Sequence, residues 1–301
     1  MTARIGDARP RPPVLVVASR PGQLGNMLLL SAHFIAAARR HGVSVANPAL
    51  GDYSDWFEGS CGRGIAVYPA RGRASWAWRC HRGAGYFLAY GLARLCVRLA
   101  APPGVGVIAL DWGQTYALDD PRNLDWLRSR RLVLCQGWQF RVSGGLLPDR
   151  EALRDYFRPI AVHGRAVAAF LESAHAGATV LVGVHVRRGD YRRFMGGRFL
   201  HSLSDYAGLM GHVAGELRGR AVRFVVCSDE ALDLSVFRPL EVVPGPGSPL
   251  RDLYALAGCD LLVAPPSTFS MWASFYGGVP LYQVADPSIR PSLGDFRPYL
   301  G

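Results

Sequence analysis

The chain has 301 residues, of which 50% are apolar and 19% are charged, a balance that excludes an intrinsically disordered protein. At roughly 100–200 residues per domain, this length predicts two domains or one large one. The formal charge is +11 and every basic residue is Arg, whose guanidinium fork matches phosphate oxygens, so a phosphate-bearing ligand is favoured. The longest apolar runs, 14–18 and 179–186, are far shorter than the roughly 20 residues of a membrane span, and the first is shorter than a signal-peptide core.

The first half of the chain begins with an Arg/Pro-rich leader, residues 1–12. An apolar strand at 14–19, a helix at 26–40 with one apolar face, and a strand at 43–46 then predict a βαβ unit with parallel strands. The Gly-, Trp- and Arg-rich stretch 51–90 gives no clear prediction. Later elements are strands at 105–110 and 131–135, and a helical stretch at 148–174 that is broken near Pro159.

The second half alternates strands and helices more regularly. The continuous apolar run 179–186 predicts a strand that is buried on both faces. The other expected strands are 222–227, 241–243, 260–264 and 279–283, and the expected helices are 205–217, 230–236, 251–257 and 267–276. This alternation predicts an α/β fold with two doubly wound halves, residues 1–160 and 161–301.

The most informative motif is His185-Val186-Arg187-Arg188-Gly189-Asp190, at the carboxyl end of the expected buried strand. Ligands of open α/β sheets bind at that edge. Because side chains alternate along a strand, His185 and Arg187 share one face, which favours ligand contacts for both. Arg188 takes the other face, and there an ion pair with Asp190 is an equally good alternative to a ligand contact.

Two further segments also follow expected strands. Ser267 and Thr268 open a helix after Pro265-Pro266, where they either cap the helix or help its free N–H groups to bind phosphate. Asp229 follows the strand at 222–227, where its carboxylate either binds a base or ribose hydroxyl or caps the next helix.

A fourth segment, Gly22-Gln23-Leu24-Gly25-Asn26, joins the first strand to the first helix. Its glycines allow a close approach of the backbone to a ligand. It is neither a Walker loop nor a GxGxxG loop, so on its own it predicts a tight turn as readily as a binding loop.

Metal and redox chemistry have little support in the sequence. It contains no HxxxH, HExxH, CxxC or Asp-x-Asp motif, which predicts that no metal is bound and that Arg stabilises any leaving diphosphate. Three of the six cysteines lie in apolar segments and are expected to be buried thiols: Cys135, Cys227 and Cys259. A reduced, cytoplasmic protein is therefore expected.

Together, these four segments resemble the alpha-1,2-fucosyltransferase family, glycosyltransferase family 11. That family's Gly-x-Leu-Gly-Asn-Gln loop corresponds to residues 22–26, its His-x-Arg-Arg-Gly-Asp-Tyr motif to 185–191, its Ser-Leu-x-x-Tyr stretch to 202–206, its Ser-Asp-Asp to 228–230, and its Asn-Ser-Ser/Thr-Phe-Ser-Trp-Trp helix start to 266–272. Met27, Pro266 and Met271 depart from the family pattern. The central motif also occurs in alpha-1,6- and protein O-fucosyltransferases, so it indicates GDP-fucose more firmly than the linkage.

The resemblance implies a GT-B-like fold of two Rossmann-type halves with a cleft between them. Residues 1–160 would shape the acceptor side and residues 161–301 would bind the GDP-sugar. The implied reaction inverts GDP-β-L-fucose to an α-fucoside, with an alpha-1,2 linkage to galactose as the first expectation. Arg187, with Arg188 and the Ser267/Thr268 helix start, would hold the diphosphate. The catalytic residues would be Arg187 and Asp190, with the alternative that Asp190 only orients Arg188.

The nucleoside and the loop complete the implied site. His185 and Asp229 would contact guanine or ribose, and Gly22, Gly25 and Asn26 would line the donor site. The partners are then GDP-fucose and a glycan acceptor, with no cofactor and no metal. The Arg-rich surface is also expected to allow peripheral contact with anionic lipid at the inner face of a membrane.

Three alternatives remain open at this stage: an alpha-1,6- or other GDP-sugar transferase, a catalytically dead GDP-sugar-binding homologue, and a nucleic-acid binder. The last is disfavoured because the Arg residues are scattered and do not form a tract interleaved with aromatic residues.

Overall fold

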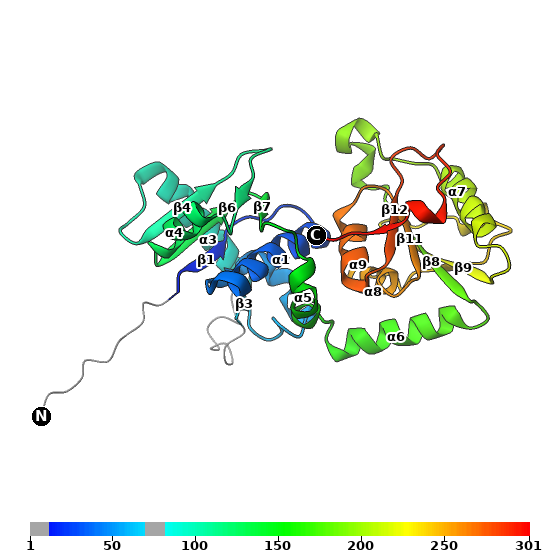
Figure 1. The fold of residues 1–301 in the computed structure, drawn as a ribbon, viewed down its shortest axis with the longest axis horizontal. Coiled ribbons are helices and arrows are strands. Elements are labelled where there is room, and N and C mark those ends of the chain that lie inside the picture. Colours follow the sequence, from blue (N-terminus) through cyan, green and yellow to red (C-terminus); the bar gives the residue numbers. More distant parts are fainter. Residues whose placement is uncertain (1–11, 70–81) are drawn as a thin grey trace, which may run out of the picture. The chain divides into compact units, whose positions relative to one another are not determined.

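The computed structural model describes residues 12–69 and 82–301; the expected leader 1–12 therefore lies almost wholly outside the described residues. The chain divides into two compact units (Figure 1). The first unit comprises residues up to Pro21, Leu30–Asp55 and Gly59–Leu146. The second unit comprises Gly22–Leu29, Trp56–Glu58 and Leu147–Gly301, so the loop at 22–26 belongs with the C-terminal half of the chain.

The first unit contains a five-stranded sheet in the order β3-β2-β1-β6-β4. Its strands are β1 (Val14–Val17), β2 (Ser44–Asn47), β3 (Ala66–Tyr68), β4 (Val105–Ala109) and β6 (Leu132–Gln136). All pairs are parallel except β2 with β3. A small separate sheet pairs β5 (Tyr116–Ala117) with β7 (Phe140–Arg141).

The α-helices α1 (Leu24–His41), α3 (Arg82–Leu99) and α4 (Pro121–Arg128) and the 3-10 helix η1 (Pro48–Trp56) connect these strands. Asp120 caps α4 by accepting from the backbone N–H of Arg122. Each element predicted for residues 14–46, 105–110 and 131–135 is confirmed, whereas α3, α4 and β3 were not predicted.

The second unit contains a six-stranded sheet in the order β10-β9-β8-β11-β12-β13. In chain order this is 3-2-1-4-5-6, the order of the Rossmann fold, with only the last strand antiparallel. Its strands are β8 (Val180–Val186), β9 (Val222–Ser228), β10 (Val242–Pro244), β11 (Leu261–Ala264), β12 (Pro280–Gln283) and β13 (Arg297–Pro298). Its helices are α5 (Arg150–Tyr156), α6 (Ala161–His175), α7 (Leu203–Glu216), α8 (Pro249–Leu256) and α9 (Thr268–Gly277).

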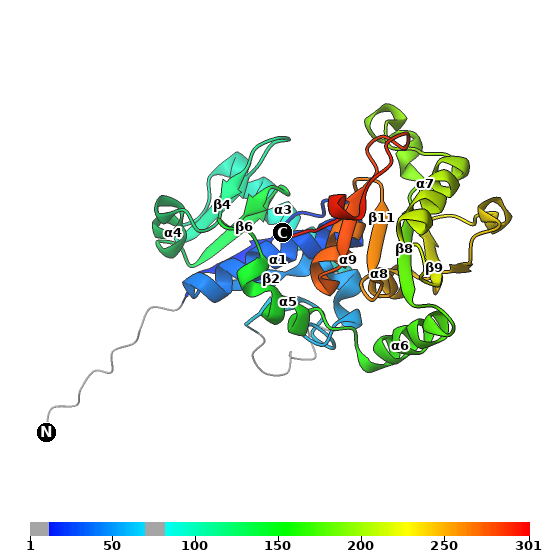
Figure 2. The ribbon, with the colours of Figure 1, turned by 45° about the vertical axis from the view of Figure 1, so that its right-hand side comes forward.

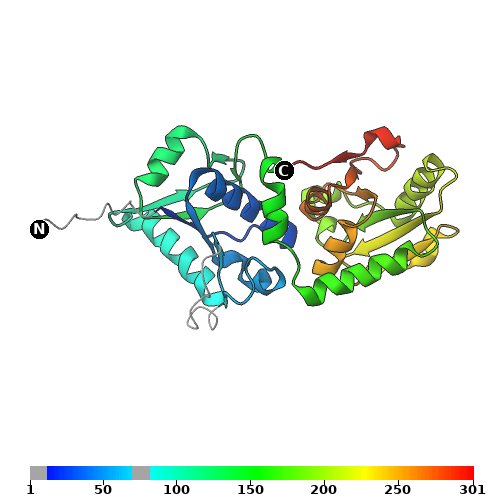
Figure 3. The same ribbon diagram turned by 60° about the horizontal axis from the view of Figure 1, so that its bottom comes forward.

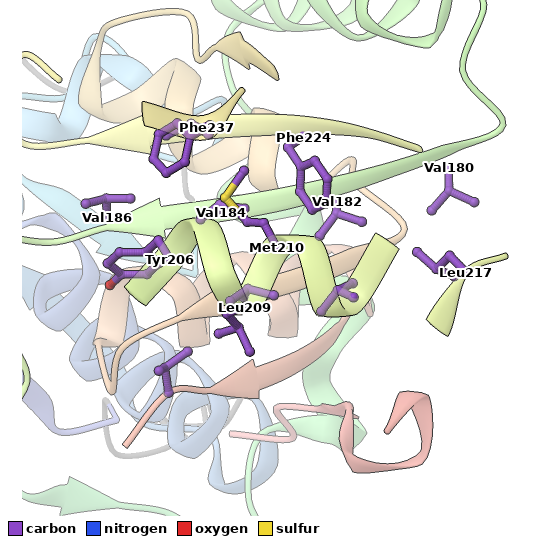
Figure 4. Packing of buried hydrophobic residues seen from close by; sticks show 14 of the residues in the cluster. Val180, Val182, Val184, Val186, Tyr206, Leu209, Met210, Leu217, Phe224 and Phe237 are labelled. Carbon is purple, nitrogen blue, oxygen red and sulfur yellow. The ribbon is translucent and has the colours of Figure 1, made fainter. Parts of the chain in front are cut away.

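Helices cover both faces of this sheet, with α7 on one side and α8 and α9 on the other (Figures 1 and 2). The helix α6, drawn in green, runs beside α8, drawn in orange (Figure 3). Every residue of β8 is buried, as its continuous apolar run predicted. On the α7 side, Val182 and Val184 pack against Leu209, Met210 and other core residues (Figure 4).

One predicted helix of the second half is wrong. Residues 230–236 do not form a helix, and only a short 3-10 helix, η5 (Leu234–Phe237), begins there. Asp233 caps η5 by accepting from the backbone N–H of Ser235. The side chain of Glu230 binds two arginines, Arg188 and Arg192, a contact that the local sequence pattern cannot reveal.

Two expectations from composition can also be compared with the structure. Cys135, Cys227 and Cys259 are buried, as predicted, and burial raises the pKa of each thiol. Among the described residues, no helix is both long enough and apolar enough to cross a membrane.

Candidate active site at the carboxyl edge of the second sheet

The strand order of the second sheet reverses between β8 and β11, which are neighbours in space but not in sequence. In open α/β sheets, ligands bind in the crevice outside the carboxyl ends of the strands at such a switch point. Arg187 follows β8 directly, and Ser267 follows β11 after a two-proline turn. The two segments expected to bind phosphate therefore lie at the switch point.

Arg187 is fixed from two sides. Its Nε lies 2.8 Å from the Asp190 carboxylate and 3.4 Å from that of Asp229, and its Nη2 donates to Gln23 Oε1 at 3.0 Å. Its guanidinium also lies 5.9 Å from the ring centroid of Tyr191. Among the described residues, no hydrogen bond uses Nη1, so that edge of the fork is open to an anionic ligand.

Arg188 has different partners from those expected. Its Nε donates to Glu230 at 2.7 Å, and its Nη1 lies 3.5 Å from the backbone oxygen of His201. Arg192 binds the same carboxylate through both terminal nitrogens, at 2.9 and 3.0 Å. The alternative Arg188–Asp190 ion pair is therefore wrong: Asp190 pairs with Arg187, and Arg188 is held by Glu230.

Asp229 binds the loop that follows β8. Its two oxygens accept from the backbone N–H groups of Arg188 and Gly189, at 2.9 and 3.0 Å. A Cβ at Gly189 would lie 2.7 Å from the Asp229 carboxylate, so this contact needs a glycine. Asp229 does not cap a following helix, and its placement supports the shape of the Arg187 loop; a contact with base or ribose stays a prediction.

His185 is buried, 4% exposed, inside the sheet edge. Its ring packs against Phe269 at a centroid distance of 4.9 Å, and its Nδ1 has no hydrogen-bond partner among the described residues. Burial and the nearby Arg187 lower its pKa from 6.5 to about 3, so the imidazole is neutral at ordinary pH. A neutral, unsatisfied ring nitrogen at this position can accept or donate one hydrogen bond to a ligand.

The helix α9 begins beside these groups. Ser267 is its N-cap, and its Oγ accepts from the backbone N–H of Phe269 at 3.3 Å. Thr268 is the first helical residue, and no acidic residue lies in the first turn. Tyr191 ties the two segments together because its hydroxyl donates to the backbone oxygen of Pro266 at 2.5 Å.

The loop at 22–26 lies directly against the start of α9. A Cβ at Gly25 would lie 2.5 Å from the backbone nitrogen of Phe269 and 2.7 Å from the carbonyl carbon of Thr268, so only glycine permits this approach. Gly22 has a positive φ of 114°, and a Cβ at this position would lie 2.8 Å from Nδ2 of Asn26 in the same loop. The loop thus joins the site, as its sequence suggested.

Three contributors were not predicted. Gln23 binds Arg187, and Glu230 holds both Arg188 and Arg192. Asp252, on α8, is a buried carboxyl that accepts from the backbone N–H of Gly247 at 2.8 Å, and burial raises its pKa. A buried acid four residues after the Gly245-Pro246-Gly247-Ser248 turn is the sequence signal that could have drawn attention to it.

The first unit has a polar cluster at the carboxyl end of its own sheet. Arg20, three residues after β1, lies 2.6 Å from the Asp52 carboxylate, and its guanidinium lies 5.1 Å from the ring centroid of Tyr86. The Asp52 side chain is 58% exposed. Charged and aromatic groups at this sheet edge can bind a polar ligand through hydrogen bonds and ring stacking.

Within the described residues, no group of three or more His, Cys, Asp or Glu side chains is arranged to hold a metal ion. The charged groups near Arg187 instead pair with one another.

Comparison with known proteins links this site to one enzyme family. Residues 153–291 match the family model described as Glycosyl transferase family 11. A galactoside 2-alpha-L-fucosyltransferase SEC1 from Bos taurus is 30% identical over 138 residues, which are 43% of this chain and 34% of the relative. The match thus spans about a third of the relative's length.

Solved structures show the same fold. A mutant of Arabidopsis thaliana FUT1 in complex with GDP has a TM-score of 0.59 at 13% identity, covering 97% of this chain and 75% of that one. POFUT1 in complex with GDP has a TM-score of 0.54 at 13% identity, covering 94% and 98%. Fucosyltransferase NodZ from Bradyrhizobium has a TM-score of 0.55 at 16% identity, covering 94% and 100%. The expected GT-B-like fold is confirmed.

Proposed function

We propose that the chain is a fucosyltransferase that moves L-fucose from GDP-β-L-fucose to a hydroxyl of a glycan, because residues 153–291 match the model of glycosyl transferase family 11. The relative from Bos taurus favours an alpha-1,2 linkage to galactose. An alpha-1,6 linkage or another GDP-sugar would use the same donor chemistry, because the residues around Arg187 act on the diphosphate and not on the acceptor.

The observation that carries this proposal is the open edge of Arg187 at the switch point of the second sheet. The Nη1 group has no hydrogen bond within the described residues, while the rest of the guanidinium is fixed by Asp190, Asp229 and Gln23. A fork held in this way presents donors to a diphosphate without having to reorganise. The N-terminus of α9 adds backbone N–H groups and a positive partial charge on the same edge.

Transfer with inversion requires the acceptor hydroxyl to attack C1 of fucose from the side opposite the diphosphate. Negative charge then grows on the departing GDP, where Arg187 and the start of α9 stabilise it. Asp190 orients Arg187 through the 2.8 Å contact with its Nε, so we assign it as a positioning residue. His185, neutral and buried, is placed to hydrogen-bond the nucleoside through Nδ1.

The test is calorimetric titration of GDP into the wild type, Arg187→Ala and Arg187→Lys. We expect Arg187→Ala to weaken GDP binding by roughly tenfold to a hundredfold, the loss of a charge-assisted hydrogen bond to phosphate. Arg187→Lys should keep only part of the GDP affinity, because the point charge of Lys does not replace the guanidinium fork. Arg165→Ala is the matched control, since Arg165 is exposed on α6, and its GDP affinity should equal that of the wild type.

Unchanged GDP affinity in a folded Arg187→Ala variant would show that Arg187 does not bind the diphosphate. An array of glycan acceptors with labelled GDP-fucose then separates an enzyme from a dead homologue. Transfer to one acceptor supports the proposal and identifies the linkage, whereas GDP binding without transfer to any acceptor supports a binding protein that has lost catalysis.

The acceptor is assigned to the first unit. The Arg20–Asp52 pair and the Tyr86 ring lie at the edge where open α/β sheets bind ligands, and a sugar can stack on an aromatic ring while its hydroxyls bind charged groups. We expect Tyr86→Ala to raise the KM for the acceptor while the KM for GDP-fucose stays the same. A rise in the donor KM alone would contradict this assignment.

A further inference from the structure

The helix α3, whose ribbon is drawn in cyan in Figure 3, exposes an unusual number of large apolar side chains. The residues concerned are 41% to 72% exposed: Phe87, Leu88, Tyr90, Leu92, Leu95, Val97 and Leu99. Only small side chains face the sheet, because Ala89 and Ala93 are the buried residues of this helix that pack there. A soluble monomer rarely exposes a contiguous apolar patch of this kind without a partner.

The exposed residues form an ordered stripe. Four leucines follow the spacing i, i+4, i+7 and i+11, which places them along one line of the helix: Leu88, Leu92, Leu95 and Leu99. Arg94 and Arg98 are exposed next to this stripe, one turn apart on the helix surface. The helix contains no acidic residue.

We propose that α3 is a membrane-docking helix that lies on the surface of an anionic lipid bilayer, with the leucine stripe inserted and the arginines at the headgroups. A helix that exposes a stripe of leucines and carries only Arg charges binds such a surface by burying apolar area and attracting anionic lipid. This docking does not depend on the donor-site assignment, because α3 belongs to the first unit and the donor site to the second, and the variants below leave the proposed acceptor residue Tyr86 unchanged.

Charge distinguishes a bilayer from a second copy of the chain. A leucine stripe with this spacing also suits pairing of two helices, in which the charges beside the stripe set the choice and orientation of the partner. Two copies of α3 would bring Arg94 and Arg98 against further arginines, with no carboxylate on either helix to pair with them. Anionic headgroups supply that negative charge.

The test is co-sedimentation of the full chain with vesicles of pure phosphatidylcholine and of phosphatidylcholine containing one part in four phosphatidylglycerol. We expect binding to the anionic vesicles that high salt weakens. Arg94→Gln with Arg98→Gln should reduce it about thirtyfold, the product of two roughly fivefold effects. Leu92→Gln with Leu95→Gln should reduce it at least about tenfold by removing inserted apolar surface.

Val162→Gln with Arg165→Gln is the matched control, because both residues are exposed on α6. Binding by this control should equal that of the wild type; an equal loss would show that general positive charge is responsible and would overturn the proposal. Vesicle binding that the leucine variant leaves unchanged would also overturn it. A dimer in light scattering that the leucine variant dissociates, without vesicle binding by the wild type, would assign the stripe to a second copy instead. GDP titration of the same variants should match the wild type, which keeps this test separate from that of the proposed function.

Discussion

Lowering the pH from 7.5 to 5.5 should destabilise the fold through its buried histidines. Burial lowers the pKa of His185 and of His33 from 6.5 to about 3, so neither imidazole gains a proton in the folded chain at pH 5.5. In the unfolded chain both have the ordinary pKa and do bind a proton there. The unfolded state therefore holds more protons below about pH 6.5, and the free energy of unfolding falls as the pH is lowered.

The size of the effect follows from these pKa values. At pH 5.5 an unfolded imidazole with a pKa of 6.5 is protonated about ten times more often than not, which stabilises the unfolded state by RT ln 11, or about 1.4 kcal/mol per histidine. The folded imidazoles add almost nothing, because pH 5.5 lies well above a pKa of about 3. Together, the two histidines should lower the free energy of unfolding by about 2.8 kcal/mol, mostly between pH 6.5 and 5.5.

The assay is urea unfolding of the wild type and of His185→Gln, followed by fluorescence at pH 7.5 and 5.5. The variant should lose about 1.4 kcal/mol less than the wild type between the two pH values, whatever its stability at pH 7.5. His175→Gln is the control, because His175 is exposed, and it should lose as much as the wild type. If His185→Gln keeps the full pH dependence of the wild type, then His185 is not a buried neutral imidazole, and its assigned contact with the nucleoside fails with it.

Four further outcomes are expected at the donor site. Gly25→Ala should abolish or strongly reduce turnover with a smaller loss of thermal stability, because its Cβ would lie 2.5 Å from a backbone nitrogen of α9; a variant with wild-type kinetics would refute the loop's role. Ser267→Ala combined with Thr268→Ala should lower turnover more than the fall in Tm explains, whereas a cap alone would cost about 0.5–2 kcal/mol of stability and leave kinetics at low temperature unchanged. Asp190→Asn should lower kcat and leave the pH profile of kcat unchanged, because a positioning residue acts through Arg187; a lost limb of that profile would instead identify a base. Transfer should also survive EDTA, and loss restored by Mn²⁺ or Mg²⁺ would contradict an Arg-based leaving-group site.

The segments that form the site could be predicted from the sequence because each follows an apolar strand, and the carboxyl ends of parallel strands meet at one edge. This rule predicts that Arg187 and Ser267 lie at the same edge of the sheet. The partners of the charged groups could not be predicted in the same way. Alternation along β8 separates Arg187 from Arg188, but it does not show that Glu230, at the end of the neighbouring strand, captures Arg188 and leaves Asp190 to Arg187.

The secondary structure of the stretch 51–90 could not be predicted, and α3 shows the physical reason. A surface helix is recognised by large apolar residues on the buried face and polar residues outside. In α3 this pattern is reversed: Ala89 and Ala93 are buried, and leucines such as Leu92 face outward. The helix also contains Gly85 and Gly91, which lower its intrinsic helix propensity. A helix that turns its large apolar residues outward therefore lacks the sequence pattern by which a surface helix is predicted.

Under the proposed function, the charges around Arg187 bear on how one guanidinium would bind a diphosphate. Asp190 and Asp229 both lie within 4 Å of its Nε and partly neutralise its charge, which by itself would weaken the attraction for GDP. The same contacts fix the side chain, so its rotamer entropy is lost on folding and not on binding. Gln23 holds Nη2 from the opposite side, leaving Nη1 as the free donor among the described residues. A fixed donor contributes most where charge develops during the reaction, so this arrangement favours the departing diphosphate over the bound donor. Arg188 differs from Arg187 in its partners, because its Nε donates to Glu230 and its Nη1 lies near the backbone oxygen of His201.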